Sequence, residues 1–168
     1  MSEDLKTTPT MRIEVSVSQQ VLNLYQGDQV VASYFVSTAA KGVGELMGSE
    51  KTPRGRHYIR AKIGAGLPEN AVFVGRRFTG EIYGPELACS APDRDWILGR
   101  ILWLCGCEVG KNRLGDVDSM RRFIYIHGTP DTELMGIAKS HGCIRMRNAE
   151  LVELFDHVEP GCRVDILE

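Results

Sequence analysis

Two histidines and a cysteine lie close together in the one segment of this sequence whose residue types suggest covalent chemistry. The segment is Ile126-His-Gly-Thr129 followed by Ser140-His-Gly-Cys-Ile-Arg-Met146. A cysteine becomes a strong nucleophile as a thiolate, which requires a neighbouring base or cation. His141 lies two residues before Cys143 and His127 sixteen residues before it, so a loop can bring either imidazole to the thiol. The pattern indicates acyl transfer by a Cys-His pair.

A glycine directly before the cysteine suits the same chemistry. Gly142 allows the backbone to turn tightly, which brings amide N–H groups near the position where a tetrahedral oxyanion would form. Without such neighbours, a lone cysteine or histidine is more often a packed or hydrogen-bonded structural residue than a functional one.

A zinc site is the main chemical alternative. His127, His141 and Cys143 are all zinc ligand types, and Cys105-Gly-Cys107 would add sulfur. Cys-x-Cys lacks the two-residue gap that structural zinc sites prefer, and His-Gly-Cys is too short for two side chains to chelate one ion without strain. We therefore expect neither a metal nor another cofactor.

Length and charge narrow the classes of function. The 168 residues suffice for one domain, and a net charge of -2 with a pI near 6.1 gives no general attraction to nucleic acid or anionic lipid. No apolar stretch approaches the roughly 20 residues that cross a bilayer. The first nine residues lack the basic and apolar regions of an export signal, and the five cysteines are an odd number. These features predict a cytoplasmic protein without a nucleic-acid or membrane partner.

The segments that position the motif show mostly β-type patterns. Polar and apolar residues alternate from 11 to 17, which is typical of a strand with one exposed face. The segment 93–104 fits a helix or a strand, and a strand at 100–105 is favoured. Phe123, Tyr125 and His127 would share one face of their strand. Further strands are predicted at 21–25, 30–36, 56–62, 71–74, 81–83, 122–127 and 163–167.

One helix is predicted at 148–158, where Asn148 can cap the start and Pro160-Gly161 ends it. The glycine-rich segment 41–51 is either a lid over a substrate or a surface loop. We expect a short arm at 1–10 and a single domain at 11–168. Its fold would be a mainly β sandwich or barrel with one or two short helices.

The motif closely resembles the signature of the L,D-transpeptidase catalytic domain, the YkuD family. That signature is a His-Gly pair followed by Ser-His-Gly-Cys and a nearby Arg, which here are His127-Gly128 and the segment from Ser140 to Arg145. Three upstream segments are also similar to the family, namely 20–25, 36–38 and Thr52-Pro-Arg-Gly with the residues to 59. The resemblance covers nearly the whole chain and implies a mainly β fold.

The resemblance implies a peptidoglycan stem peptide as the partner and a role for each main residue. Cys143 would attack the carbonyl of the meso-diaminopimelate or lysine residue before the terminal D-Ala of a tetrapeptide stem. D-Ala would leave and an acyl-enzyme would remain. His127 would be the general base, oriented by a backbone carbonyl near Gly128. Carbapenem inhibitors, which acylate the cysteine of this family, would add to Cys143.

The other residues of the motif would support this reaction. His141 and the amides of Gly142 and Cys143 would line the oxyanion site, and Ser140 would support the turn. Arg145 would hold a substrate carboxylate or brace the loop. The arginines at 76, 77 and 147 could face the anionic stem, although a solvated surface is the commoner explanation for such charges.

The expected cytoplasmic location affects the predicted fate of the acyl-enzyme. Family members are mostly exported, whereas a cytoplasmic enzyme meets dilute muropeptides in water. We therefore expect an L,D-carboxypeptidase of murein recycling that removes D-Ala by hydrolysis. One alternative is an L,D-transpeptidase that forms 3-3 cross-links or exchanges D-amino acids in the periplasm after export by an unrecognised route. Another is a muropeptide-binding module without turnover.

Overall fold

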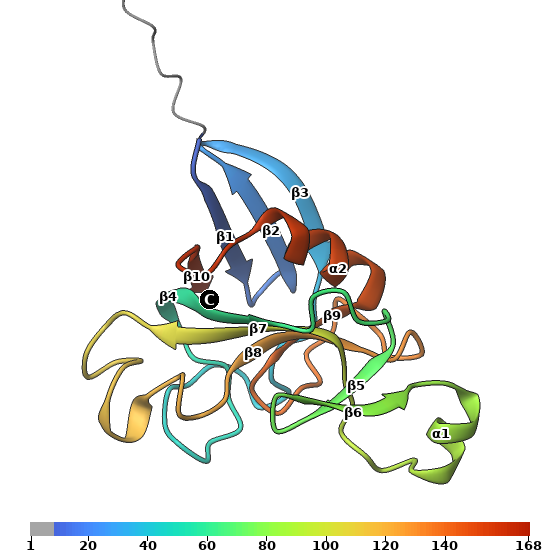
Figure 1. Ribbon diagram of the computed structural model, residues 1–168. Helices are drawn as coiled ribbons and strands as arrows, with labels where there is room; N and C mark the ends of the chain where they lie inside the picture. The colour runs from blue at the N-terminus through green and yellow to red at the C-terminus, as the bar shows by residue number, and fades with distance from the viewer. Residues whose placement is uncertain (1–8) are drawn as a thin grey trace, which may run out of the picture.

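One strongly curled β-sheet is the main structural element of the protein (Figure 1). The computed structural model describes residues 9–168, and within them the strand order is β3-β2-β1-β10-β4-β7-β5-β6, with β8 pairing to both β7 and β9. The strands are β1 (Met11–Ser16), β2 (Val21–Gln26), β3 (Gln29–Phe35), β4 (Gly55–Ile63), β5 (Ala71–Val74), β6 (Arg77–Ile82), β7 (Ile97–Gly106), β8 (Tyr125–Thr129), β9 (Ile144–Arg147) and β10 (Arg163–Leu167). The helices are α1 (Pro85–Ser90) and α2 (Asn148–His157), with a 3-10 turn at Gly115–Val117. The predicted mainly β fold is confirmed.

The first strand follows the predicted alternation. Ile13 and Val15 are fully buried, whereas Arg12 and Glu14 lie on the other face, with their charged groups 3.1 Å apart. β1 pairs with β2 in antiparallel and with β10 in parallel orientation, so the first and last strands are neighbours. Residues 1–8 of the predicted arm lie outside the described residues.

The ambiguous segment before residue 105 is the central strand β7, as favoured from the sequence. β7 pairs with β4, β5 and β8, and most of its residues are buried. Its register with β8 shifts between Leu98 and Ile101, where Gly99 has a φ of +76°. A Cβ at Gly99 would lie 2.7 Å from the carbonyl oxygen of Glu69, so the chain approaches too closely there for a larger residue.

Helix α2 covers the inside of the curled sheet and completes the core. It packs on β7, β8 and β9, and Leu151, Leu154 and Phe155 are buried in the same cluster as the inward side chains of β1 and β2. Asn148 does not cap this helix, because Arg147 occupies the N-cap and the Asn148 amide donates to Asn70 Oδ1 at 2.9 Å. No helix within residues 9–168 combines the length and apolarity that a bilayer span needs.

The predicted strand at 122–127 is wrong at its start. Phe123 lies in a turn with a φ of +57°, and β8 begins at Tyr125. The Asp118 carboxylate accepts the N–H groups of Leu114 and Arg121 at 2.7 and 3.0 Å and holds the chain in turns. Consequently, Phe123 does not share a strand face with Tyr125 and His127.

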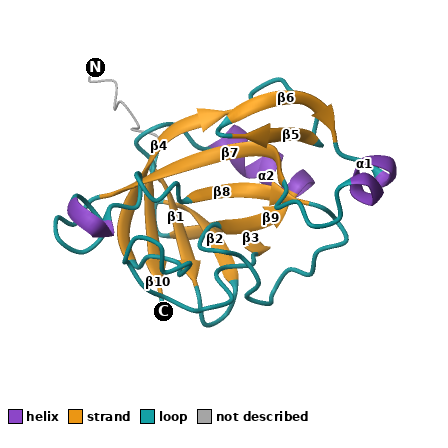
Figure 2. Cartoon of the chain, turned by 90° about the horizontal axis from the view of Figure 1, so that it is seen from below, coloured by secondary structure: helices purple, strands orange, loops and turns teal. Residues whose placement is uncertain are grey.

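Three further elements differ from the prediction. β6 begins at Arg77 and ends at Ile82, whereas the sequence predicted only 81–83, and neither α1 nor β9 was located. β9 has only four residues and directly follows the motif, so no periodicity identified it. Figures 1 and 2 show that β5, β6 and α1 together form one edge of the molecule.

Candidate active site

The residues of the chemical motif meet in one cleft of about 350 Å³ at the ends of β8 and β9. These strands pair in parallel with His127 opposite Arg145, and Cys143 comes directly before β9. The walls of the cleft combine motif residues with side chains from three other segments of the chain. The lining residues are Gly75, Arg76, Asp95, Ile97, Phe123, Tyr125, His127, Ser140, His141, Cys143 and Arg145.

The turn that carries the cysteine is held by hydrogen bonds within it and by hydrogen bonds from a neighbouring segment. Ser140 Oγ donates to the carbonyl oxygen of Cys143 at 2.5 Å and accepts the N–H of Gly142 at 3.2 Å. Gly142 has a φ of +132°, which favours glycine. Thr52 Oγ1 is fully buried, donates to the Gly142 carbonyl at 2.9 Å and accepts the N–H of Ala39 at 3.0 Å. The Thr-Pro-Arg-Gly segment therefore supports this turn directly.

The Cys143 thiol lies between two backbone groups. Sγ donates to the carbonyl oxygen of Phe123 and accepts the N–H of Tyr125, both at 3.3 Å. Burial raises the pKa of Cys143 to about 11, and the Tyr125 N–H opposes this shift only in part. The resting thiol is therefore neutral at pH 7.

His127 is oriented by the backbone and is also neutral. Its Nδ1 lies 2.6 Å from the carbonyl oxygen of Gly128, which assigns the proton to Nδ1 and leaves the lone pair on Nε2. Burial lowers the pKa of His127 to about 4, although the Gly128 carbonyl favours the charged form. No hydrogen bond joins His127 to Cys143 in the described structure, so the thiol must rotate away from Phe123 to reach Nε2.

Gly128 is required by close packing. A Cβ at this position would lie 1.9 Å from Asn148 Oδ1 and 2.5 Å from the carbonyl oxygen of Leu98. The carbonyl that orients His127 is thus fixed between the start of α2 and strand β7.

Asp95 is a cleft residue that the sequence analysis missed. Its carboxylate accepts a hydrogen bond from Arg145 Nη2 at 3.0 Å and lies 3.5 Å from His141 Nδ1. The Arg145 side chain is only 10% exposed, so it braces the Asp95 loop against β9. Asp95 comes from the loop before β7, where nothing but its acidic type marked it.

Two of the groups expected to line the oxyanion site make other contacts in the structure. The His141 side chain is 63% exposed and faces Asp95 at the mouth of the cleft. The Gly142 N–H already donates to Ser140 Oγ, whereas the hydrogen bonds within residues 9–168 include none from the Cys143 N–H. The Cys143 amide is therefore the free backbone donor nearest to the nucleophile.

The segment 41–51 contributes no residue to the lining of the cleft. Instead, the Arg122 guanidinium donates to the carbonyl oxygens of Gly44, Glu45 and Lys51, with the shortest distance, 2.6 Å, to Lys51. Within the described part of the chain, no three His, Cys, Asp or Glu side chains are grouped so that they could hold a metal ion.

A sequence profile of the L,D-transpeptidase catalytic domain, the YkuD family, matches residues 10–166. The chain belongs to this family. A Bacillus licheniformis protein named as the L,D-transpeptidase YkuD is 29% identical over 155 residues, which are 92% of this chain and 64% of that protein. This YkuD-family chain thus spans less than two thirds of the length of that relative.

Solved L,D-transpeptidases have the same fold. A mutant L,D-transpeptidase from Enterococcus faecium superposes with a TM-score of 0.57 at 18% identity and covers 95% of this chain and 50% of its own. An L,D-transpeptidase in complex with imipenem gives a TM-score of 0.57 at 16% identity, over 95% of this chain and 59% of its own. At these identities the similarity establishes the fold alone.

Proposed function

We propose that this protein is a cysteine acyl-transfer enzyme that acts on peptidoglycan stem peptides. The observation that carries the proposal is the pairing of Cys143 and His127 in one cleft, with His127 Nδ1 held by a carbonyl and Nε2 left available as a base. Membership of the YkuD family supports the tetrapeptide stem as the substrate class.

In the acylation step, the Cys143 thiol gives its proton to His127 Nε2, and Sγ attacks the carbonyl carbon of the third residue of the stem. The Cys143 N–H stabilises the oxyanion. When the tetrahedral intermediate breaks down, the C–N bond to D-Ala breaks and His127 donates its proton to the leaving amine. A thioester on Cys143 remains.

Supporting residues keep this geometry in place. Ser140 and Gly142 hold the cysteine turn, and the Gly128 carbonyl keeps the imidazole in the tautomer that accepts a proton. Arg145 binds Asp95, which in turn holds His141 at the mouth of the cleft. Arg145 is therefore a positioning residue rather than a substrate ligand.

We further propose water as the acyl acceptor, which makes the enzyme an L,D-carboxypeptidase. A cleft of about 350 Å³ is at the small end of the range for ligand sites, and water needs no second peptide subsite. His127 takes a proton from the attacking water, and Cys143 leaves the thioester as a thiol after His127 returns the proton. Soluble muropeptides released during wall recycling in the cytoplasm are the substrates that match this reaction.

Transpeptidation is the second candidate, and family membership favours it, because the Bacillus relative is named as an L,D-transpeptidase. In that reaction, an amine of a second stem or a free D-amino acid replaces water. Both reactions share the same thioester on Cys143.

Mass spectrometry of products from a disaccharide tetrapeptide, with and without an added D-amino acid, separates the candidates. Tripeptide and free D-Ala in water alone support hydrolysis, whereas exchange products or dimers without hydrolysis support transpeptidation. A Cys143→Ala protein is the control, since residual turnover would contradict the proposed nucleophile. Fractionation of cells with detection of the native protein tests the cytoplasmic setting.

Inhibitor binding offers an independent test of the nucleophile. Imipenem should add covalently to Cys143, as suggested by the complex of a protein with the same fold. Intact-mass measurement should show the adduct on the native protein and none on Cys143→Ala. The same mass gain on the variant would place the reactive group elsewhere.

A further inference from the structure

We propose that Arg76 binds a carboxylate of the stem peptide in the Cys143 cleft and so determines which stems the enzyme accepts. The proposal rests on the function proposed above, because it assigns a specificity to the same cleft. The family motif does not include this residue, which comes from the hairpin between β5 and β6.

The backbone presents Arg76 in an unfavourable conformation. Gly75 and Arg76 form the tip of the hairpin with φ values of +56° and +65°. Turns with two positive φ values usually carry Asn, Asp or Gly, because a Cβ is strained there. Strain of this kind in a non-glycine residue concentrates at ligand sites, where the side chain is needed in one position.

Three aromatic side chains then fix the guanidinium. Its central carbon lies 4.6 Å from the ring centroid of Trp103 and 4.7 Å from that of Phe123, and Nη1 donates to Tyr125 Oη at 3.0 Å. Tyr125 also donates its backbone N–H to Cys143 Sγ at 3.3 Å. One tyrosine therefore contacts the nucleophile through its backbone and the arginine through its hydroxyl, and both Arg76 and Cys143 line the same cleft.

The charges of the cleft leave Arg76 as its unpaired cation. Asp95 is the carboxylate among the lining residues, and it is already bound to Arg145 and close to His141. No carboxylate of residues 9–168 lies within 4.0 Å of the Arg76 guanidinium, and only one of its donors is used by Tyr125. A partly buried guanidinium with a free planar edge is suited to a carboxylate.

A stem peptide offers two such groups near the scissile bond. One is the terminal carboxylate of D-Ala, and the other is the side-chain carboxylate of a diaminopimelate at the third position. Either carboxylate could bind the Arg76 guanidinium, and peptides that lack one of the two show which one does.

The test compares kcat and KM of the native enzyme with those of Arg76→Met and Arg76→Lys on three tetrapeptides. The first has diaminopimelate and a free terminus, the second has lysine at the third position, and the third ends in a carboxamide. We expect Arg76→Met to raise KM for the first peptide about tenfold or more, as for loss of one charged hydrogen bond, with little change in kcat. Arg76→Lys should recover part of this loss because it keeps the charge.

The peptide on which Arg76→Met has no effect identifies the carboxylate. Loss of the effect on the carboxamide peptide assigns the terminal group, and loss of the effect on the lysine peptide assigns the side chain. An equal change on all three peptides, or no change on any, would overturn the proposal. Arg77→Met is the matched control, because Arg77 is the exposed neighbour that does not line the cleft.

Binding measurements separate failure of this proposal from failure of the proposed function. If the native enzyme turns over none of the peptides, the proposed function fails, and calorimetry on Cys143→Ala with and without Arg76→Met still measures the carboxylate contact. Weaker binding in the double variant, confined to peptides with the carboxylate, supports Arg76. Equal binding in both proteins contradicts it.

Discussion

Two buried histidines occupy similar environments and differ in one contact. His57 in β4 and His127 in β8 each have Nδ1 within hydrogen-bond distance of a backbone carbonyl, from Gly55 at 3.0 Å and from Gly128 at 2.6 Å. Burial lowers the pKa of both to about 4. The Nε2 of His57 lies 2.8 Å from Ser119 Oγ, whereas His127 lines the cleft together with Cys143 and its Nε2 has no hydrogen-bond partner within residues 9–168. Burial and a backbone anchor are thus not sufficient for a base, which also needs a free second nitrogen.

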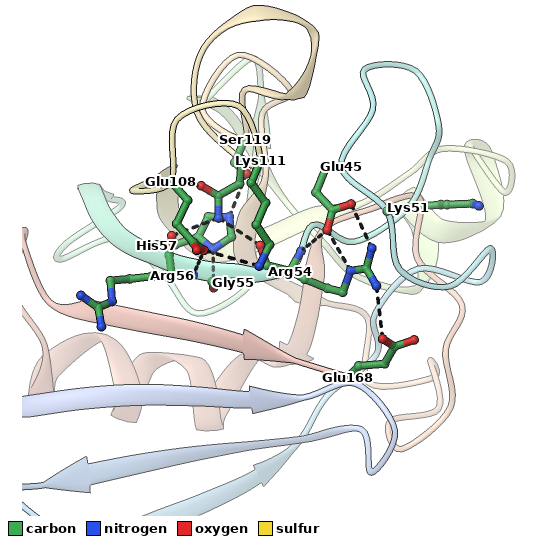
Figure 3. A network of polar contacts seen from close by, with 12 residues as sticks. Glu45, Lys51, Arg54, Gly55, Arg56, His57, Glu108, Lys111, Ser119 and Glu168 are labelled. Atoms are coloured by element: carbon green, nitrogen blue, oxygen red, sulfur yellow. Dashed lines mark hydrogen bonds and ion pairs between the residues drawn. The ribbon is translucent and has the colours of Figure 1, made fainter.

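The surroundings of His57 explain its structural use. Figure 3 shows it beside a polar network in which the Glu108 carboxylate accepts the N–H of Arg56 and lies 3.7 Å from Lys111 Nζ. Through Ser119, His57 ties β4 to the long connection that precedes β8. None of these residues lines the cleft. The network therefore anchors the connection before β8 and lies outside the cleft.

The largest expected effect is the loss of activity when the free imidazole is removed. His127→Leu should lower kcat/KM by about a hundred- to ten-thousand-fold, the usual contribution of a general base. His57→Leu is the matched control and should keep its activity per folded molecule. Steady-state kinetics with D-Ala release as the readout tests both variants. A His127→Leu enzyme with native activity would contradict the assignment of the base.

The pH dependence of stability should reflect both histidines. Their pKa values are about 4 when folded and near 6.5 when unfolded, so the unfolded chain binds more protons below pH 6.5. The stabilisation is complete above pH 6.5 and is lost as the pH falls toward 4, by about 3 kcal/mol for each histidine. Urea unfolding from pH 7 to pH 4 measures the slope. His57→Leu should reduce the slope, and an unchanged slope would rule out His57 as a source.

Parts of this comparison were accessible from the sequence. The motif located Cys143 and His127, because the loop between them is short and the residue types are chemically distinctive. The structural role of His57 could not be predicted from the sequence, since its contact with Ser119 joins residues 62 positions apart. Asp95 was missed as a cleft partner for the same reason. Arg76 was named with Arg77 and Arg147 as able to face the stem, and the structure places only Arg76 of these three in the lining of the cleft. The strand before His127 was misplaced because the Asp118 side chain stabilises turns that override β propensity.

The third effect is on stability at pH 7, where the loss of His57 should matter more than the loss of His127. His57→Leu should reduce the free energy of unfolding by about 2 kcal/mol, because it leaves the buried Ser119 hydroxyl without its partner. His127→Leu should cost less, since its Nε2 has no protein partner to leave unpaired. Chemical denaturation of both variants at pH 7 provides the comparison. A larger loss for His127→Leu would show that the cleft, rather than the network, depends on its histidine for stability.

The smallest effect concerns the support of the cysteine turn. Thr52→Val removes a donor to the Gly142 carbonyl and an acceptor for the Ala39 N–H, both buried, and should destabilise the fold by about 1 to 2 kcal/mol. Because the turn positions the Cys143 amide, kcat should also fall several-fold. Thr79→Val is a matched control, since Thr79 Oγ1 likewise donates to one carbonyl and accepts one N–H, but on the exposed strand β6. If both variants lower stability equally and leave kcat unchanged, Thr52 supports the fold alone. A fall in kcat confined to Thr52→Val shows that the Thr-Pro-Arg-Gly segment maintains the geometry of the turn that carries Cys143.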